Sequence, residues 1–303
     1  MSSEFEKGVL QVNSVLFEND TEAVRRTIEC LNRAADLAIA GGVFSSVRLT
    51  YGDCSGAPIL SEEFLGRVRG DSDALESIEY VFFHKNLGSA RGHNTLLSDT
   101  NAEYTLVMNP DVRLAPTCLV ELAKHMRSPE VGMVEAKQLP IEHPKVFNEK
   151  TGETSWAATA CAIFPTKLLK SLEGFDADTF FLYCDDVDMS WRIRLDGKKV
   201  IYEPAAVIFH DKRLGVGGRW QVGDAEKYFS AEAALLLAYK YSRNDIVSHI
   251  IADFRSATDS VYARALKNFE DRKVSNTLPK TLDASHKVGQ FIDGAYALHR
   301  FKP

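Results

Sequence analysis

Short apolar stretches alternate with amphipathic stretches over the first two-thirds of the chain. The apolar stretches predict buried strands at residues 9–18, 44–53, 77–86, 104–111 and 131–140. Apolar side chains that recur every three or four positions predict helices at residues 22–40, 89–99 and 115–126. Repeated strand–helix units favour an α/β fold, with a mainly parallel, doubly wound sheet and helices on both faces.

The first predicted helix has recognisable signals at both ends. Asn19 followed by Glu22 matches a capping box, and Gly41-Gly42 is typical of a helix end. One face of this helix carries the apolar residues Val24, Ile28, Leu31, Ala35 and Ala38. We therefore expect this face to pack against the sheet.

The pattern changes along the rest of the chain. Residues 141–156 are polar and rich in turn formers, which predicts a loop over the sheet, and further strands are predicted at 157–164 and 198–210. A Gly-rich stretch follows at 211–224, and from about residue 225 only helical patterns occur. The sequence thus predicts an α/β domain over residues 1–215, then a Gly-rich linker and a C-terminal helical region over 216–303.

Composition limits the classes of function. The chain has 303 residues, a net charge of −6 and 45% hydrophobic residues, so nucleic acid is not expected as a partner. Its five cysteines are scattered and form no CxxC pair, which favours reduced thiols in the cytoplasm over a disulfide framework or a zinc site. We find no signal-peptide pattern and no apolar run of about 20 residues, so any membrane association would be peripheral.

Polar residues stand where the predicted strands end, and ligands bind at that edge of open α/β sheets. Asp53, Asn86 and Asp111 all occupy such positions. Asp111 follows Asn-Pro, so it either belongs to a turn or holds a divalent cation. His210 ends the last strand and is either structural or a metal ligand. The loop at residues 85–94 is either a simple helix entry or a nucleotide-binding loop, and it matches neither a P-loop nor a Rossmann fingerprint.

The stretch FFLYCDDVD (residues 180–188) brings an aromatic run directly before three carboxylates. Asp188 is placed to pair with Arg192 one helical turn later. Asp185 and Asp186 lie at a helix start, where the macrodipole favours negative charge, but one acid is enough for that purpose. An apolar flank would raise the pKa of a buried carboxyl and make it a candidate general base. Both interpretations remain open on this pattern alone.

Two tryptophans accompany this segment. Trp191 falls on the apolar face of the predicted helix, together with Val187 and Leu195, which favours core packing. Trp156 lies where a polar loop meets a strand, so the pattern favours neither core packing nor contact with a ligand.

Taken in order, three stretches resemble the family 2 inverting glycosyltransferases with a GT-A fold. They are NLGSARGHN, LVMNPDV and GFDADTFFLYCDDVDMSWRIRLDGKKVIYEPAAVIFH. The similarity is greatest to the bacterial rhamnosyltransferase-like and galactofuranosyltransferase-like branch. It covers roughly residues 9 to 212, and the long final motif is its most specific part.

The resemblance implies a role for each matching residue. Asp111 and His210 would bind Mg²⁺ or Mn²⁺, with Asn109 where the first Asp of the family's Asp-x-Asp motif stands. Asp186 would be the general base, and Asp185 would support it or contact the acceptor. Trp156 would either contact the acceptor sugar or pack in the core. The donor-nucleotide loop would comprise Asn86, Gly88, Arg91 and Asn94. Two departures occur: Asp53 lies in Gly-Asp-Cys-Ser where the family has Asp-Asn-x-Ser, and Asn109 weakens the metal site by one charge.

The implied protein is a hexosyltransferase that acts on a nucleotide-sugar donor, with a rhamnose-like deoxyhexose favoured. Its acceptor would be a hydroxyl of a growing bacterial surface glycan, such as O-antigen or capsule, and usually lipid-linked. This expectation places the protein in the cytoplasm, at the inner face of the inner membrane if it is peripheral, and leaves a homo-oligomer open.

Two alternatives belong to other classes. A nucleotidyltransferase of similar fold would be expected to carry a Gly-rich loop with Lys or Arg after the first strand, which VLFENDTEA does not provide. A non-catalytic glycan-binding or scaffold protein is disfavoured because Asp111, Asp185, Asp186 and His210 are all retained.

Overall fold

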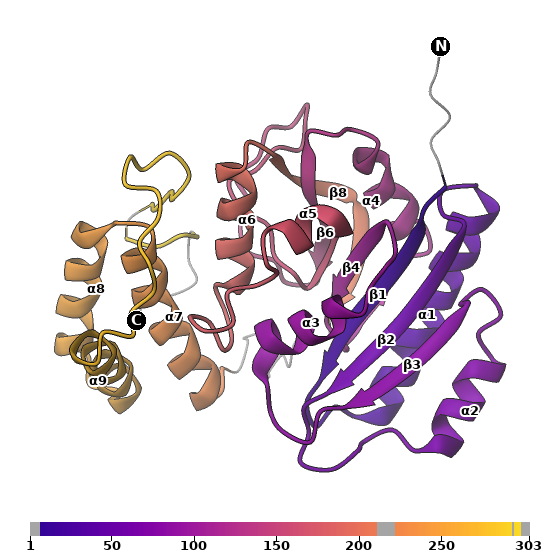
Figure 1. Ribbon diagram of the computed structural model, residues 1–303, viewed down its shortest axis with the longest axis horizontal. Coiled ribbons are helices and arrows are strands. Elements are labelled where there is room, and N and C mark those ends of the chain that lie inside the picture. The colour runs from indigo at the N-terminus through magenta and orange to yellow at the C-terminus, as the bar shows by residue number, and fades with distance from the viewer. Residues whose placement is uncertain (1–6, 211–221, 293, 298–303) are drawn as a thin grey trace.

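A computed structural model describes residues 7–292 and 294–297, except for residues 211–221. Its described residues form one eight-stranded sheet in the order β3-β2-β1-β4-β7-β6-β8-β5 (Figure 1). The strands are β1 Val9–Leu16, β2 Ser46–Asp53, β3 Ser77–Phe82, β4 Tyr104–Met108, β5 Val112–Leu114, β6 Val131–Leu139, β7 Cys161–Pro165 and β8 Lys199–His210.

Strand directions bring the predicted polar positions to one edge of the sheet. β3, β2, β1 and β4 are mutually parallel, as the repeated strand–helix units predicted. β7 runs antiparallel to both β4 and β6, so β6 points the same way as β4, and β8 is parallel to β6. β5 completes the sheet as an antiparallel partner of β8. The carboxyl ends of β1, β2, β4, β6 and β8 therefore share one edge.

Helices cover both faces of the sheet. One face packs against α1 Thr21–Ala40, α2 Glu62–Gly70 and α4 Cys118–Met126. The other face packs against α3 Gly88–Ser98, α5 Thr166–Ser171 and α6 Asp185–Leu195 (Figure 1). Neighbouring residues of one strand contribute to opposite cores: Leu106 and Met108 to the first, Val107 to the second. This alternation explains why the strands are apolar throughout.

The first helix confirms its predicted face and corrects its predicted cap. The five apolar positions on α1 are buried, and Gly41 caps its carboxyl end. The N-cap is Asp20, whose carboxylate accepts a hydrogen bond from the Glu22 amide, whereas the Asn19 side chain accepts from the Phe17 amide. The predicted capping box at Asn19 was therefore wrong by one residue.

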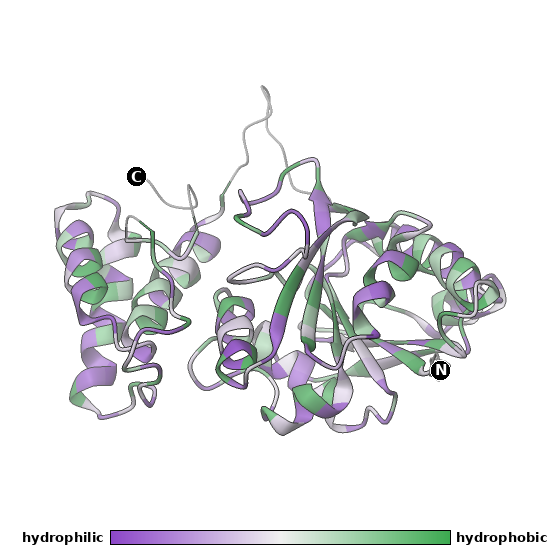
Figure 2. Cartoon of the chain, turned by 90° about the horizontal axis from the view of Figure 1, so that it is seen from above, coloured by the Kyte–Doolittle hydropathy of each residue, from purple (hydrophilic) through white to green (hydrophobic). Residues whose placement is uncertain are grey.

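Three helices follow the sheet domain, as the C-terminal pattern predicted. They are α7 Asp224–Lys240, α8 Asn244–Ser256 and α9 Ser260–Val274. Figure 2 shows them as a separate group beside the sheet domain. A shared apolar cluster joins the two parts, with Phe180 and Trp191 from the sheet domain, Leu235 from α7 and Tyr241 directly after α7. The predicted boundary at 215/216 lies outside the described residues.

No helix in the described ranges is both long and apolar enough to cross a membrane.

Candidate active site

Helix α6 carries the acidic pair to the carboxyl edge of the sheet. A turn after Leu195 joins α6 to β8, and β8 begins at Lys199 beside Val131, the first residue of β6. α6 therefore runs from the carboxyl edge back to the amino edge. Its first residues, Asp185 and Asp186, lie at the edge where β4, β6 and β8 end.

The two acids of the pair have different environments. Asp185 is buried, and this burial, together with the charge of Asp186, raises its pKa to about 7. The Asp185 and Asp186 amides and the Ser89 hydroxyl of α3 oppose that rise by hydrogen bonding to the carboxylate. Asp186 is only half-buried, and its Oδ1 accepts from the Val187 amide at 2.8 Å. The pair thus combines a buried carboxyl with a more accessible one.

The backbone immediately before the pair is strained. Tyr183 and Cys184 both have left-handed conformations, with φ values of 65° and 57°. For residues with a Cβ, this conformation costs about 1–2 kcal/mol each. Such strain persists only where the surrounding structure enforces it, and it is concentrated at functional sites. The aromatic run therefore reaches Asp185 through a tight, enforced turn.

Asp111 and His210, the predicted metal ligands, lie side by side. The Nε2 atom of His210 is 3.3 Å from Oδ1 of Asp111 and 3.4 Å from Nδ2 of Asn109. On the other side of the ring, Nδ1 is 3.0 Å from Oε1 of Gln138 on β6. Because a carboxamide oxygen only accepts, Nδ1 carries the proton in this contact, and in the neutral ring the lone pair of Nε2 is directed toward Asp111 and Asn109.

The donor set fits a divalent cation. A neutral imidazole nitrogen with a carboxylate oxygen suits Mn²⁺ and related metals, and a hydrogen bond to the far ring nitrogen is the usual support of a ligating histidine. No group of three or more His, Cys, Asp and Glu residues in the described part of the chain is arranged for a metal ion. Asp111 and His210 would thus supply part of the coordination shell of such an ion. Oxygen atoms of a bound ligand and of water would supply the rest.

The predicted nucleotide loop divides into two parts. Its first part lies against the aromatic run: the Ser89 amide donates to the Phe181 carbonyl at 3.1 Å, and Gly88, with φ +70°, lies so close that a Cβ would be 2.5 Å from that oxygen. The exposed Asn86 accepts from the Gly88 amide at 3.0 Å and so shapes the turn. This part of the loop borders Asp185.

The second part of that loop contacts the loop at residues 174–178. The carboxamide of Asn94 accepts from the Phe175 amide at 2.8 Å and donates to the Phe175 carbonyl at 2.7 Å. Arg91 pairs with Asp178 at 2.5 Å, and both side chains are largely exposed. In this structure Asn94 anchors the loop at residues 174–178, which is a different role from the predicted nucleotide contact.

Burial corrects two further predictions. Asp53 is fully buried, and its carboxylate accepts from the Ser55 amide, the Ile59 amide and the Tyr80 hydroxyl, so it holds the loop after β2 and is not open to a nucleotide. Trp156 is only 4% exposed and packs edge-on against Tyr296, so it belongs to the core and not to an acceptor surface. Both replace predicted ligand contacts with structural roles.

Sequence reasoning missed several residues of this site. Gln138 could have been suspected as a polar residue near the end of an apolar strand, and Ser89 as a hydroxyl at a helix start. Lys240 gave no signal, because it ends an apolar helix more than 50 residues after the acidic pair. Its ammonium nevertheless contacts Asp188 at 2.6 Å.

Comparison with known proteins supplies the name of the fold. A mannosyltransferase from Pyrobaculum calidifontis, in complex with GDP-Man and Mn²⁺, superposes with a TM-score of 0.58 at 16% identity, over 92% of this chain and 78% of that one. GalNAc-T7 with UDP, GalNAc and Mn²⁺ gives 0.64 at 10%, over 93% and 57%. S. aureus TarS gives 0.53 at 14%, over 88% and 43%. The chain has the GT-A fold of glycosyltransferases.

Sequence comparison also finds a glycosyltransferase. The pre-mycofactocin glycosyltransferase of Mycobacterium tuberculosis is 24% identical over 210 residues, which is 62% of this chain. The chain matches 42% of that relative's length. No family model matches the chain.

Proposed function

We propose that the protein is an inverting glycosyltransferase that moves a sugar from a nucleoside-diphosphate donor to an acceptor hydroxyl. The observation that carries this proposal is the pairing of His210 with Asp111 at the edge of a GT-A sheet where Asp185 and Asp186 also lie. Asp111 and His210 offer ligands for a cation that would bind the diphosphate of the donor. The acidic pair offers a base for the acceptor.

The proposed cation is Mg²⁺ or Mn²⁺, held by Asp111 and His210 beside Asn109. When bound, such an ion would offset the negative charge that develops on the diphosphate leaving group. Gln138 holds His210 in the tautomer that leaves Nε2 free for this purpose.

Asp186 is the proposed general base, because it is the more accessible carboxylate of the pair. It would accept the proton of the acceptor hydroxyl while that oxygen attacks the anomeric carbon. The bond between that carbon and the diphosphate oxygen breaks, and the nucleoside diphosphate leaves. Asp185, buried behind Asp186 and bonded to Ser89, would orient it. A base of this kind contributes about 10²–10⁴-fold to the rate.

For the substrates, the sequence resemblance favours a rhamnose-like deoxyhexose and the hydroxyl of a bacterial surface glycan, carried on a lipid. The names of the similar proteins widen the set of donors to be tested, because two of them were solved with GDP-Man or with UDP and GalNAc. Asn86 and Gly88 border Asp185 and remain our candidates for contact with the donor.

A donor screen tests the proposal. Purified protein is mixed with dTDP-rhamnose, UDP-galactofuranose, GDP-mannose or UDP-GalNAc, with and without Mn²⁺, and release of nucleoside diphosphate is measured. We expect cation-dependent release with one donor class. Absence of release with every donor would contradict the proposal and favour the glycan-binding alternative.

The same assay tests the base. Asp186→Asn should lower the rate about 10²–10⁴-fold. Asp196→Asn is the matched control, because Asp196 is an exposed acid at the opposite end of the same helix. Equal rates for Asp186→Asn and Asp196→Asn would show that Asp186 is not the base.

A further inference from the structure

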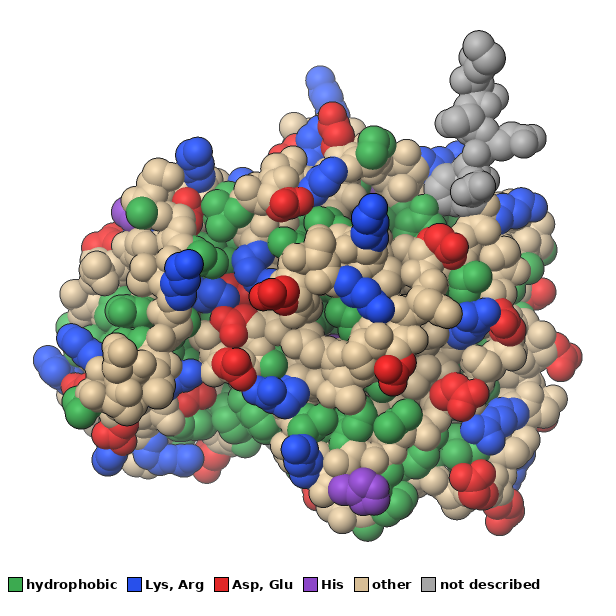
Figure 3. Space-filling model, in the orientation of Figure 1, with side chains coloured by type: hydrophobic (Ala, Val, Ile, Leu, Met, Phe, Trp, Pro, Cys, Tyr) green, Lys and Arg blue, Asp and Glu red, His purple; other side chains and the backbone are tan. Residues whose placement is uncertain are grey.

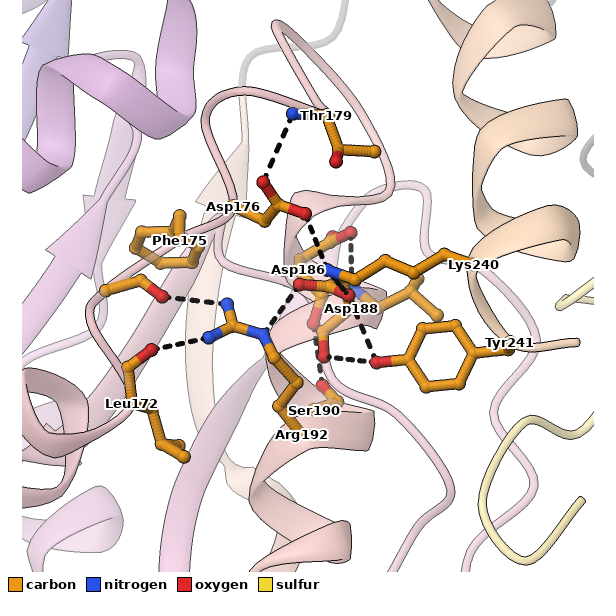
Figure 4. Close-up of polar contacts among 12 residues, drawn as sticks. Leu172, Phe175, Asp176, Thr179, Asp186, Asp188, Ser190, Arg192, Lys240 and Tyr241 are labelled. Carbon is orange, nitrogen blue, oxygen red and sulfur yellow. Dashed lines mark hydrogen bonds and ion pairs between the residues drawn. The ribbon is translucent and has the colours of Figure 1, made fainter. Parts of the chain in front are cut away.

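The C-terminal helices contact the segment that carries the acidic pair through one buried lysine. Lys240, the last residue of α7, is 5% exposed. Its ammonium lies 2.7 Å from Asp176 and 2.6 Å from Asp188. These two carboxylates stand on either side of the aromatic run and of Asp185–Asp186, so a single cation ties both ends of the segment to α7 (Figure 4).

The Asp188 end of this contact is fully built. Asp188 has no exposed surface, and its carboxylate also receives Nε of Arg192 at 2.8 Å and the Tyr241 hydroxyl at 3.0 Å. Arg192 donates further to the carbonyls of Leu172 and Gly174, both at 2.7 Å. The network therefore extends from α7 through α6 to the chain that precedes Asp176.

The Asp176 end is held by polar contacts more than by packing. A cavity of about 360 Å³ adjoins it, with Arg91, Asp176, Arg192 and Lys240 among its lining residues. Space of this size would let the segment move if its ion pair were lost. Figure 3 shows charged side chains of both signs over the junction of the two parts.

The middle of the segment requires such restraint. Tyr183 and Cys184 are the strained residues of the turn, and Phe180 packs in the cluster shared with α7, its ring 5.5 Å from the Lys240 ammonium. A second helix adds to the hold, because Arg272 of α9 donates to the backbone carbonyl of Asp178 at 2.8 Å. The strained turn is thus enclosed by contacts from the C-terminal helices.

We propose that Lys240 is a positioning residue for catalysis: by binding Asp176 and Asp188 together, it fixes where Asp185 and Asp186 stand at the sheet edge. The C-terminal helices are then a part of the active site and not an independent appendage. The catalytic consequence rests on the proposed glycosyltransferase function. The structural consequence, a fixed segment over residues 176–188, does not.

The test compares three variants of the full chain. Lys240→Met removes the charge but keeps most of the stem, Lys240→Arg restores a cation, and Ile250→Ala removes packing in α8 and leaves the Lys240 ion pairs intact. Ile250→Ala is the control for a general loss of stability, which we expect at about 2–4 kcal/mol. Assays are run well below the lowest melting temperature of the set.

Two readouts separate positioning from stability. Steady-state kinetics should show a kcat about 10²-fold lower for Lys240→Met, because small misplacements cost that much, with a donor KM within about threefold of wild type. Lys240→Arg should recover most of that loss, since the adjoining cavity accommodates the longer side chain. Hydrogen–deuterium exchange should rise over residues 177–187 in Lys240→Met and remain unchanged there in Ile250→Ala.

The outcomes can be told apart from failure of the proposed function. If wild type shows no transfer with any donor, the proposed function fails. The exchange measurement still tests whether Lys240 fixes residues 176–188. The positioning role of Lys240 is overturned if Lys240→Met leaves hydrogen–deuterium exchange over residues 177–187 at the wild-type level. It is also overturned if the kcat of Lys240→Met matches that of Ile250→Ala. Should Lys240→Met fail to fold, Asp176→Asn opens the same contact while Asp188 keeps all its partners, and the same two readouts apply.

Discussion

Asp188 and Asp185 lie one turn apart on α6, and both are buried, yet the protein treats them in opposite ways. Asp188 receives two cations and a hydroxyl group. Asp185 lies beside the Asp186 carboxylate, and its own carboxylate accepts hydrogen bonds from backbone amides and from the Ser89 hydroxyl. Asp53 resembles Asp188, because protein groups donate hydrogen bonds to its carboxylate. Asp111 resembles Asp185 instead, because a cation can bind between its carboxylate and the neighbouring His210.

The contrast separates carboxylates that hold the fold from carboxylates that are kept for a ligand. Burial alone does not distinguish them, since Asp53, Asp185 and Asp188 are all buried. The partners distinguish them. A buried charge with complete partners is costly to disrupt on one side, whereas one without them lowers stability and is retained where chemistry needs it.

The largest effect on stability is expected at Asp188. Asp188→Asn leaves Arg192 and Lys240 without their shared counter-charge, and breaking a buried pair on one side costs about 3–5 kcal/mol. Urea unfolding should show this loss. Asp178→Asn is the control, because Asp178 forms an exposed ion pair with Arg91, which is worth less than about 1 kcal/mol. Similar unfolding free energies for the two variants would break the comparison.

The next effect concerns the metal pair. Gln138→Leu removes the acceptor that fixes the His210 tautomer, and loss of such a partner weakens metal binding about 10–100-fold. Mn²⁺ titration followed by electron paramagnetic resonance measures this directly, without any assay of transfer. His125→Gln is the control, since His125 pairs with Glu203 elsewhere on the molecule at 2.6 Å. An unchanged Mn²⁺ affinity in Gln138→Leu would remove Asp111 and His210 from the set of ligands.

A smaller effect tests the role of Asp53. Tyr80→Phe removes one donor to its carboxylate, and we expect a stability loss of about 1–2 kcal/mol in thermal unfolding. The donor KM should stay within about threefold of wild type, because Asp53 is closed to ligands. A tenfold rise in the donor KM at unchanged stability would show that Asp53 contacts the donor.

The last effect depends on pH and concerns Asp185. Its pKa of about 7 in the folded protein exceeds the ordinary value of 3.8, so between these values the folded protein holds a proton that the unfolded chain has released. Stability therefore falls as pH rises through this range, and the full cost is present above pH 7. Asp185→Asn removes that cost and should raise the melting temperature by several degrees at pH 8 but not at pH 4. A gain that is independent of pH would show that Asp185 is not buried as a carboxyl group.

Much of the architecture could be predicted because it depends on local periodicity. The apolar runs located β1, β2, β3, β4 and β6, and the turn signals located Gly41 at the end of α1. The strand directions then brought Asp111 and His210 together, as expected. Short elements such as β5, α2 and α5 gave too little pattern to be recognised.

The errors share a physical cause, which is contact between residues far apart in sequence. Asp53 is closed by Tyr80, Asn94 is bound by Phe175, and Trp156 is covered by Tyr296. No local pattern specifies such partners. The same holds for Lys240, whose importance follows from its contacts with Asp176 and Asp188 and from nothing in its own neighbourhood.

The central claim is a single displacement at the anomeric carbon, with Asp186 as the base. The most direct measurement is ¹H NMR of the anomeric proton in the first product formed from the donor that the screen identifies. Our account predicts that the product has the anomeric configuration opposite to that of the donor. A product that retains the donor's configuration would contradict it.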